Sequence, residues 1–460
     1  MEPRRRDTRT ATLSPPAGSG SGRAIVVGPY LRVAKPDAEA SRGGKAQRSP
    51  QARLDEAVGL ARAIDLAVVN AGVVMLAAIR PATYLGKGKV EEIAGLVKSL
   101  EASLVVMDCA LSPVQQRNLE RAWNAKVVDR TGLILEIFGR RAATREGALQ
   151  VELAHLTYQR SRLVRSWTHL ERQRGGFGFL GGPGETQLEA DRRIIAERIA
   201  RIERDLEGVK RTRGLHRISR KRVPYPIVAL VGYTNAGKST LFNRLTNAAV
   251  LSTDMLFATL DPTLRAVDLP HGARIILSDT VGFISDLPTM LVAAFRATLE
   301  EVIEADLILH VRDVSHGDTQ AQSLDVEEVL NELGIKPEDG RIIEVWNKID
   351  RVDAAERERL ANLARRQPPE QRPMLVSAMS GEGIDALVAA IEARIARSRV
   401  TLTVDLDAAE GAAMSWLHRH TEVLDKATTE EGRTAVRIRV DPTKEGVVRG
   451  KFGARIRAAS

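Results

Sequence analysis

Residues 225–246 read YPIVALVGYTNAGKSTLFNRLT, which predicts a buried strand, a glycine-rich turn and a helix. Within this stretch lies the pattern G-x-x-x-x-G-K-[ST], which runs from Gly232 to Ser239. In such a setting, backbone N–H groups approach phosphates closely at Gly232 and Gly237, Lys238 reaches the β- and γ-phosphates, and Ser239 supplies an oxygen to Mg²⁺. The stretch therefore predicts a P-loop domain that binds a nucleoside triphosphate.

The segment IIEVWNKID at residues 342–350 indicates which base is bound. It predicts a strand that ends in N-K-x-D. The Asp350 carboxylate can accept hydrogen bonds from both the ring N–H and the exocyclic amine of guanine, an arrangement that adenine does not offer. We expect Asn347 and Lys348 to support the base and the P-loop. The motif favours GTP as the nucleotide.

Two further segments complete the domain. LVSAMSG at residues 375–381 brings Ser377 and Ala378 to the other edge of the purine. DLILHVRD at residues 306–313 supplies another strand of the sheet. The motifs together predict one Ras-like P-loop GTPase domain over residues 225–397.

The expected switch residues lie between the P-loop and N-K-x-D. The strand RIILSDTVGF ends in D-x-x-G, where Asp279 would hold Mg²⁺ through water and the N–H of Gly282 would sense the γ-phosphate. The segment LFATLDPT offers Thr259 as the residue that closes over Mg²⁺ when the γ-phosphate is present, with Thr263 as a nearby competitor.

The expected site is drawn from these segments. The predicted nucleotide-binding residues are Gly232, Tyr233, Thr234, Asn235, Ala236, Gly237, Lys238, Ser239, Thr240, Phe257, Ala258, Thr259, Leu260, Asp261, Asp279, Thr280, Val281, Gly282, Asn347, Lys348, Ile349, Asp350, Ser377, Ala378 and Met379. Among them, Lys238, Thr259 and Gly282 are expected to act in catalysis, and Ser239, Thr259 and Asp279 to hold Mg²⁺.

The residue after D-x-x-G departs from the Ras pattern. In Ras-type enzymes a glutamine at this position orients the attacking water. Here the residue is Phe283, which cannot hydrogen-bond to water. We expect slow intrinsic hydrolysis unless a partner or another group intervenes.

Two heptad patterns precede the P-loop. Apolar residues recur at spacings of three, four or seven from Leu149 to Leu170 and again from Leu188 to Val209. Two such helices joined by a short loop predict an antiparallel coiled-coil hairpin, an arm on the order of 37 Å long. Thr186 and Glu189 form a T-x-x-E capping box, which marks the expected start of the second helix.

The glycine-rich stretch RGGFGFLGGPGETQLEADRR at residues 174–193 falls at the tip of this arm. It is not a second P-loop, because no strand precedes it. Arginines crowd around it, and its two phenylalanines could stack on bases. The hypothesis is a probe that enters a structured RNA, and the alternative is a helical connector with a flexible hinge. The candidate RNA contacts are Arg172, Arg174, Gly175, Gly176, Phe177, Gly178 and Phe179.

Composition agrees with an intracellular, nucleic-acid-binding protein. The formal net charge is +9, and the excess of Lys and Arg lies in the half before the P-loop, where a polyanion would bind. A solvated basic surface is the alternative.

The single Cys109 suits a reducing cytosol, and no apolar run is long enough to span a membrane. We expect a cytoplasmic monomer, with peripheral association at a membrane left open.

The motif set resembles the HflX family of GTPases. The match rests on YLGKGKVEEI, LSPVQQRNLE, the arm and its glycine-rich tip, all ahead of the GTPase domain. The resemblance implies a ribosome-associated GTPase that binds GTP and GDP, contacts the large ribosomal subunit and its rRNA near the peptidyl transferase centre through the arm tip, and splits stalled or idle ribosomes. In related translation GTPases an asparagine at the position of Asn235 can help to ligate K⁺, and the alternative is an asparagine chosen for turn geometry.

The predicted architecture is an α/β chain of several parts. They are a basic flexible tail with one strand at 1–50, an N-terminal α/β domain at 51–138, the coiled-coil arm at 139–220, the GTPase domain at 225–397 and a small C-terminal α/β domain at 400–460. The eight histidines show no metal-ligand spacing. Two functions remain: a ribosome-remodelling GTPase, or a GTP-dependent signalling switch whose arm docks on a protein.

Overall fold

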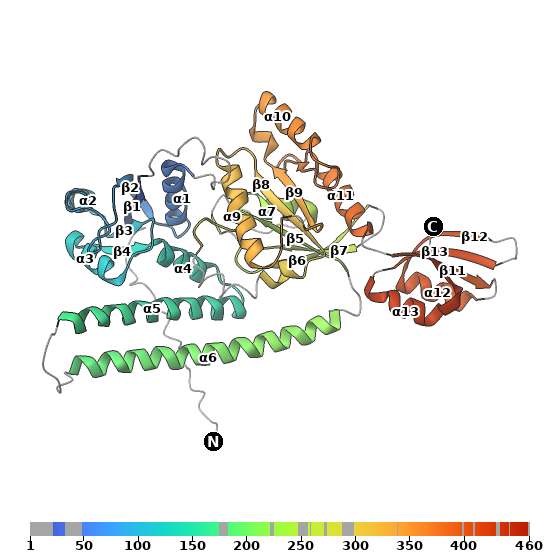
Figure 1. Ribbon diagram of the computed structural model, residues 1–460, viewed down its shortest axis with the longest axis horizontal. Helices are drawn as coiled ribbons and strands as arrows, with labels where there is room; N and C mark the ends of the chain where they lie inside the picture. The colour runs from blue at the N-terminus through green and yellow to red at the C-terminus, as the bar shows by residue number, and fades with distance from the viewer. Residues whose placement is uncertain are drawn as a thin grey trace, which may run out of the picture. The chain divides into compact units, whose positions relative to one another are not determined.

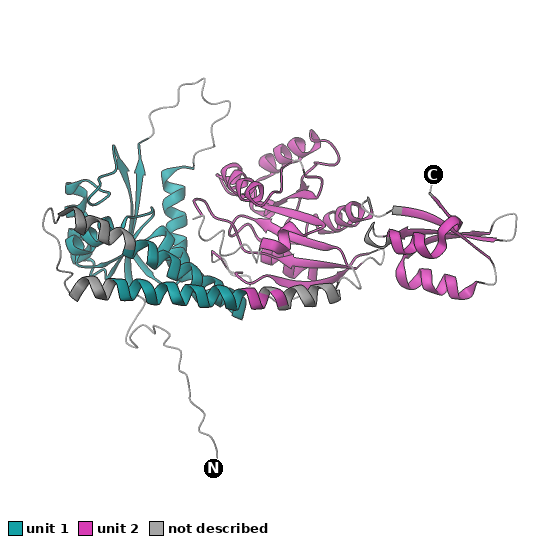
Figure 2. Cartoon of the chain, turned by 60° about the horizontal axis from the view of Figure 1, so that its bottom comes forward, with its two compact units in different colours: residues 1–206 teal, residues 207–460 magenta. Residues whose placement is uncertain are grey.

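The computed structural model describes residues 22–32, 48–173, 183–220, 225–246, 256–257, 259–270, 274–287, 299–337, 339–397, 400–407, 410–428, 433–440 and 442–458. The chain divides into two compact units, Met1–Leu206 and Glu207–Ser460 (Figure 2). The first unit holds one sheet and the arm as far as Leu206, and the second holds the rest of the arm and two sheets. The mixed α/β architecture expected from the sequence is confirmed.

A four-stranded parallel sheet of order β2-β1-β3-β4 organises the first unit (Figure 1). Its elements are β1 (Arg23–Leu31), α1 (Pro50–Arg62), β2 (Ala67–Leu76), α2 (Lys87–Ser99), β3 (Leu104–Met107), α3 (Pro113–Trp123), β4 (Lys126–Asp129) and α4 (Arg130–Arg141). We expected the strand β1 within the N-terminal tail, yet it pairs with β2 on one side and β3 on the other. Its residues are buried on both faces, as is typical of an inner parallel strand.

Charged side chains are buried where β3 and β4 end. Arg130 donates from Nη1 to Asp108 Oδ1 and from Nη2 to Glu56 Oε1, both at 2.6 Å. Tyr30 donates its hydroxyl to the other oxygen of Asp108, also at 2.6 Å. All three charged side chains are at most 7% exposed. The cluster therefore joins α1, β1, β3 and α4 through charge-assisted hydrogen bonds.

The arm consists of α5 (Arg145–Gln173) and α6 (Pro183–Arg220). The heptad prediction is confirmed near its base, where the apolar side chains of both helices form one cluster: Leu149, Leu153, Leu156, Ile195, Ile199, Ile202 and Leu206. The second helix begins at Pro183, three residues before the predicted cap, because proline is tolerated in a first helical turn, where N–H groups have no helical partner. No helix among the described residues, α5 and α6 included, is long and apolar enough to cross a membrane.

Asp129, the last residue of β4, attaches α5 to the parallel sheet. Its carboxylate accepts hydrogen bonds from the Tyr158 hydroxyl and from Arg162 Nη2, both at 2.6 Å and both from α5. The backbone N–H groups of Leu111 and Gly132 supply two further donors to it. The first helix of the arm is thus held at the carboxyl end of the sheet.

The six-stranded sheet of the second unit has the order β10-β9-β8-β5-β7-β6, with only β6 antiparallel to its neighbour. Its elements are β5 (Ile227–Gly232), α7 (Lys238–Thr246), β6 (Thr263–Asp268), β7 (Arg274–Asp279), β8 (Leu307–Asp313), α9 (Thr319–Glu332), β9 (Ile342–Asn347), η2 (Ile349–Arg351), α10 (Ala354–Arg365), β10 (Met374–Leu375) and α11 (Ile384–Arg397). Helices α7 and α11 share one core with β5 and β8, and α9 covers the opposite face (Figure 1).

A third, antiparallel sheet of order β12-β13-β11-β14 follows. Its elements are β11 (Val400–Asp407), α12 (Gly411–His420), β12 (Glu422–Thr428), β13 (Arg433–Val440), α13 (Pro442–Phe452), η3 (Gly453–Arg455) and β14 (Ile456–Ala458). Both helices pack on the face that presents Leu402, Val404 and Leu406. The strand–helix–strand order is that of a split βαβ fold.

The buried charge cluster predicts a large local loss of stability when its cation is removed. Arg130→Ala leaves Asp108 buried without its guanidinium, while Glu56 keeps its buried ion pair with Arg48, and it should lower the free energy of unfolding of the first unit by about 3–5 kcal/mol. Urea dependence of hydrogen exchange in β1 and β3 measures this loss. Arg140→Ala is the control, because the Arg140–Asp65 pair is exposed and should contribute less than about 1 kcal/mol. Equal effects of the two variants would contradict the prediction.

Candidate nucleotide-binding site

The phosphate loop follows β5 at the carboxyl edge of the six-stranded sheet. Gly232 passes so close to β8 that a Cβ placed on it would lie 2.2 Å from the Val311 carbonyl oxygen. Gly237 has a φ of +90°, and a Cβ there would lie 2.3 Å from Asn347 Nδ2. Both positions therefore require glycine, and the loop backbone is left open toward the cavity that it borders.

Lys238 begins α7, and its ammonium group is held against the loop. Nζ donates to the carbonyl oxygens of Gly232 and Tyr233, at 3.1 and 2.8 Å. Burial lowers the pKa of Lys238 to about 8, although the nearby Asp279 carboxylate acts in the opposite direction. A buried ammonium that is held by backbone carbonyls is suited to binding an anion at this point.

Three oxygen-bearing side chains from separate segments converge beside the loop. Ser239 Oγ and Thr259 Oγ1 donate to Asp279 Oδ2 at 2.7 and 2.9 Å, and the two hydroxyl oxygens lie 2.9 Å apart. Burial raises the pKa of Asp279. Its other oxygen, Oδ1, is buried with no hydrogen-bond partner in the described parts of the chain. An all-oxygen set with an unpartnered carboxylate oxygen fits a hard cation such as Mg²⁺.

Thr263, the competitor of Thr259, lies elsewhere. It is the first residue of β6, where it pairs with Asp279 in the antiparallel ladder. The structure therefore brings Thr259, and not Thr263, to the hydroxyl of Ser239.

The D-x-x-G segment is joined to the phosphate loop by backbone hydrogen bonds. The N–H of Phe283 donates to the Gly232 carbonyl at 3.1 Å, and the N–H of Thr234 donates to the Phe283 carbonyl at 2.8 Å. A Cβ on Gly282 would lie 3.0 Å from Lys238 Nζ. The Phe283 side chain is only 2% exposed. This side chain is part of the protein interior and not of the cavity wall.

Asn347 connects the phosphate side of the site to its base side. Its Nδ2 donates to the Ala236 carbonyl at 2.8 Å, and its Oδ1 accepts from the N–H of Ala378 at 2.9 Å. Lys348, which has a φ of +66°, forms an ion pair with Asp313 at 2.8 Å. Asp350 follows in η2 with its side chain exposed. The motif thus has both a buried structural amide and an accessible carboxylate.

Arg244 holds the S-A-M segment from the other side. This residue of α7 donates from Nε to the Ala378 carbonyl at 3.1 Å and from Nη2 to the Met379 carbonyl. Met379 is 75% exposed, whereas Ser377 is fully buried. Sequence reasoning missed Arg244, because no motif indicates that it reaches across more than a hundred residues of chain.

One cavity of about 440 Å³ unites these features. Its lining residues are Thr234, Asn235, Gly237, Lys238, Ser239, Thr240, Phe257, Thr259, Thr280, Gly282, Asn347, Lys348, Asp350, Arg351, Ala378 and Met379. All of them except Arg351 are predicted nucleotide-binding residues. The predicted residues that do not line it are Gly232, Tyr233, Ala236, Leu260, Asp261, Asp279, Val281, Ile349 and Ser377, and Ala258 lies outside the described residues.

The predicted RNA-contacting residues fall largely outside the described part of the chain. Arg174, Gly175, Gly176, Phe177, Gly178 and Phe179 lie outside it. The backbone of Arg172 belongs to α5.

Family profiles match the chain along most of its length. Residues 51–139 match the GTP-binding GTPase N-terminal region, and residues 141–220 match the GTP-binding GTPase middle region. Residues 227–348 match the 50S ribosome-binding GTPase domain, and residues 362–459 match the HflX C-terminal domain.

Individual proteins are also similar to the chain. A GTP-binding protein from Sulfolobus solfataricus, solved in complex with GDP, is 22% identical, with a TM-score of 0.43 over 82% of this chain and 99% of that chain. GTPase HflX of Magnetococcus marinus is 49% identical over 87% of this chain and 91% of its own length. GTPase HflX of Escherichia coli is 46% identical over 78% of this chain and 83% of its own length. With this identity over most of its length, the chain belongs to the HflX family of GTPases.

Proposed function

We propose that this GTPase binds the large ribosomal subunit in the cytoplasm and uses GTP binding and hydrolysis to dissociate stalled or idle ribosomes. The observation that carries the proposal is the cavity whose walls combine a phosphate loop, an oxygen cluster suited to Mg²⁺ and the N-K-x-D segment. The match of residues 227–348 to a 50S ribosome-binding GTPase domain supports the choice of partner.

The residues of the site receive roles that follow from their positions. Lys238 would move its ammonium group from the loop carbonyls to the β- and γ-phosphates. Ser239 and Thr259 would ligate Mg²⁺ directly, and Asp279 would hold it through water. The bound Mg²⁺ would neutralise phosphate charge during the transfer to water. Gly282 would offer its N–H to the γ-phosphate.

Water activation needs a group other than the residue after D-x-x-G, since the Phe283 side chain is buried. Asn235 lines the cavity with its side chain exposed, and it would help to ligate a K⁺ ion beside the phosphates. Its φ of +58° also suits asparagine in a left-handed turn position. The two roles are compatible, because the backbone conformation leaves the side-chain oxygen available.

The arm would carry the contact with RNA. Its two helices pack against each other near their base, and α5 is fixed to the N-terminal sheet through Asp129. The loop of residues 174–182, which contains Arg174, Phe177 and Phe179, joins the far ends of these helices in the sequence. A basic and aromatic loop on a long support suits insertion into rRNA near the peptidyl transferase centre.

The alternative function is a signalling switch whose arm docks on a protein. The two functions differ in their response to ribosomes. Purified large ribosomal subunits should raise GTP hydrolysis severalfold under the proposed function, and they should have no effect under the alternative.

Guanine specificity should depend on Asp350. Asp350→Asn should weaken GTP binding and shift preference toward xanthosine triphosphate, whose base has a carbonyl where guanine has the amine. Titration calorimetry with both nucleotides measures the change. Asp385→Asn, an exposed carboxylate on α11 outside the cavity lining, is the matched control and should bind GTP as the wild type does. Unchanged GTP affinity in Asp350→Asn would show that another group reads the base.

Basal hydrolysis should depend on K⁺ through the side chain of Asn235. Replacing K⁺ with Na⁺ should slow the wild type, and Asn235→Ala should abolish the difference between the two salts. Asn235→Gly separates the two roles of this residue, because glycine readily adopts a φ of +58° but has no oxygen side chain. If the glycine variant kept the K⁺ effect, Asn235 would act through turn geometry alone.

Arm-tip variants should affect the response to ribosomes and leave nucleotide binding intact. Replacing residues 175–184 with a short polar linker should keep GTP affinity near wild type while subunit-stimulated hydrolysis and ribosome splitting fall sharply. Arg174→Glu should weaken subunit binding. It should also reduce the slope of log affinity against log salt concentration by about the amount that one phosphate contact contributes.

Arg201→Glu is the matched control for the arm tip, since it makes the same charge change at an exposed position on the shaft of α6. A large loss of GTP affinity in the isolated loop-replaced protein would instead mean that this loop binds nucleotide, and the RNA-contact role would then be wrong.

A further inference from the structure

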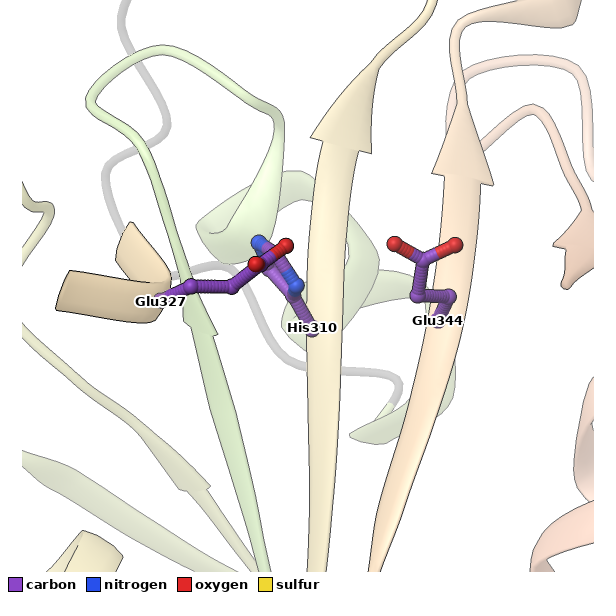
Figure 3. A group of neighbouring side chains, drawn as sticks. All are labelled: His310, Glu327 and Glu344. Carbon is purple, nitrogen blue, oxygen red and sulfur yellow. The ribbon is translucent and has the colours of Figure 1, made fainter. Parts of the chain in front are cut away.

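Three ligand-type side chains from separate parts of the second unit meet beside the six-stranded sheet. They are His310 of β8, Glu327 of α9 and Glu344 of β9. One ligand atom from each residue lies within 4.8 Å of the corresponding atoms of the other two. Figure 3 shows Glu327 reaching from the helix toward His310, and Glu344 on the neighbouring strand beside it.

His310 lacks the hydrogen bonding that its burial calls for. Its side chain is 3% exposed, and Nε2 has no hydrogen-bond partner in the described parts of the chain. An unpartnered buried polar atom is unfavourable by about 1–3 kcal/mol, so its presence needs an explanation.

Both carboxylates are already oriented by donors outside the cluster. Glu344 Oε1 accepts from Arg312 Nη1 at 2.8 Å, and Oε2 accepts from the indole N–H of Trp346 at 3.0 Å. Glu327 Oε1 accepts from the Ser323 hydroxyl at 2.9 Å. Each carboxylate oxygen has a second lone pair, so these bonds do not prevent ligation. Such outer partners commonly hold metal ligands in place.

We propose that His310, Glu327 and Glu344 form a binding site for one divalent transition-metal ion of the zinc class. An imidazole nitrogen with two carboxylates is a ligand set that Zn²⁺ accepts, whereas Mg²⁺ requires oxygen ligands and octahedral geometry. The ion would give Nε2 a partner and would neutralise two carboxylates, of which Glu344 alone forms an ion pair, with Arg312, among the described residues.

This site is distinct from the oxygen cluster of the nucleotide cavity. The two clusters share no residue, and none of the three ligands lines the cavity. They are nevertheless neighbours through the sheet, because His310 pairs in register with Val231, the residue before Gly232. A bound ion would join β8, β9 and α9 beside the strand that carries the phosphate loop. It should therefore stabilise the second unit by mass action.

The experiment measures metal binding by the full chain directly. The purified protein is freed of metal with a chelator and titrated with Co²⁺ and with Zn²⁺ in the presence of GDP and excess Mg²⁺, which occupy the nucleotide site. We expect one ion per chain, visible d–d absorption bands with Co²⁺ that Zn²⁺ displaces, and a higher thermal unfolding temperature with Zn²⁺.

Variants test the assignment of the ligands. Glu327→Gln keeps the shape of a half-buried side chain on α9 and should weaken Co²⁺ binding at least tenfold, and His310→Gln should abolish the absorption bands. His418→Gln removes an exposed histidine elsewhere and should bind as the wild type does. GDP binding by each variant confirms that the domain is folded.

Two results would overturn the proposal. One is that the wild-type protein binds Co²⁺ and Zn²⁺ no more tightly than the Glu327→Gln variant does. The other is a single bound ion that is lost in His418→Gln instead, which would identify a surface site. Because the readouts are stoichiometry, absorption and unfolding temperature, they do not depend on ribosome binding or GTP hydrolysis.

Discussion

The buried amide of Asn347 is the interaction on which the nucleotide site depends. One side chain donates to the Ala236 carbonyl and accepts from the N–H of Ala378, so a single residue fixes the distance between the phosphate loop and the base-side loop. Both contacts are shielded from water, since Asn347 is 1% exposed, and an unpaired amide there would be strongly unfavourable. Gly237 must lack a side chain for this amide to approach. The cavity shape therefore follows from one hydrogen-bonded residue at the end of β9.

In the first unit, a charged side chain joins separate segments in the way that the neutral Asn347 amide does in the second. Asp129 ends β4 and accepts four hydrogen bonds, two from backbone N–H groups and two from side chains of α5. Such a carboxylate helps to fix the orientation of a helix, because charge-assisted hydrogen bonds are strong and directional. The arm thus rests on a rigid attachment, which is what a support for a remote loop requires.

Local motifs explain why the nucleotide site could be predicted from sequence. The P-loop, D-x-x-G and N-K-x-D segments each carry their own backbone geometry. Together with the LFATLDPT and LVSAMSG segments, they account for all lining residues but Arg351. Contacts between distant segments could not be predicted. Arg244 reaches the Met379 carbonyl, and His310 meets Glu327 and Glu344, only because the sheet order places these elements side by side. The spacing of the histidines along the chain gives no sign of that cluster. Likewise, polar, glycine-rich segments flank β1, so its place in the sheet could not be predicted from its local sequence.

The burial of Phe283 constrains how this GTPase can work. Its backbone, and not its side chain, serves the site: its N–H and carbonyl join the D-x-x-G segment to Gly232 and Thr234. This bridge holds Gly282 against Lys238, so a γ-phosphate would meet the N–H of Gly282 beside the ammonium group of Lys238. Orientation of the attacking water is then left to groups on the open side of the cavity. Under the proposed function, such a site would hydrolyse GTP slowly until a further ion or the ribosomal partner completed it, so hydrolysis would follow binding.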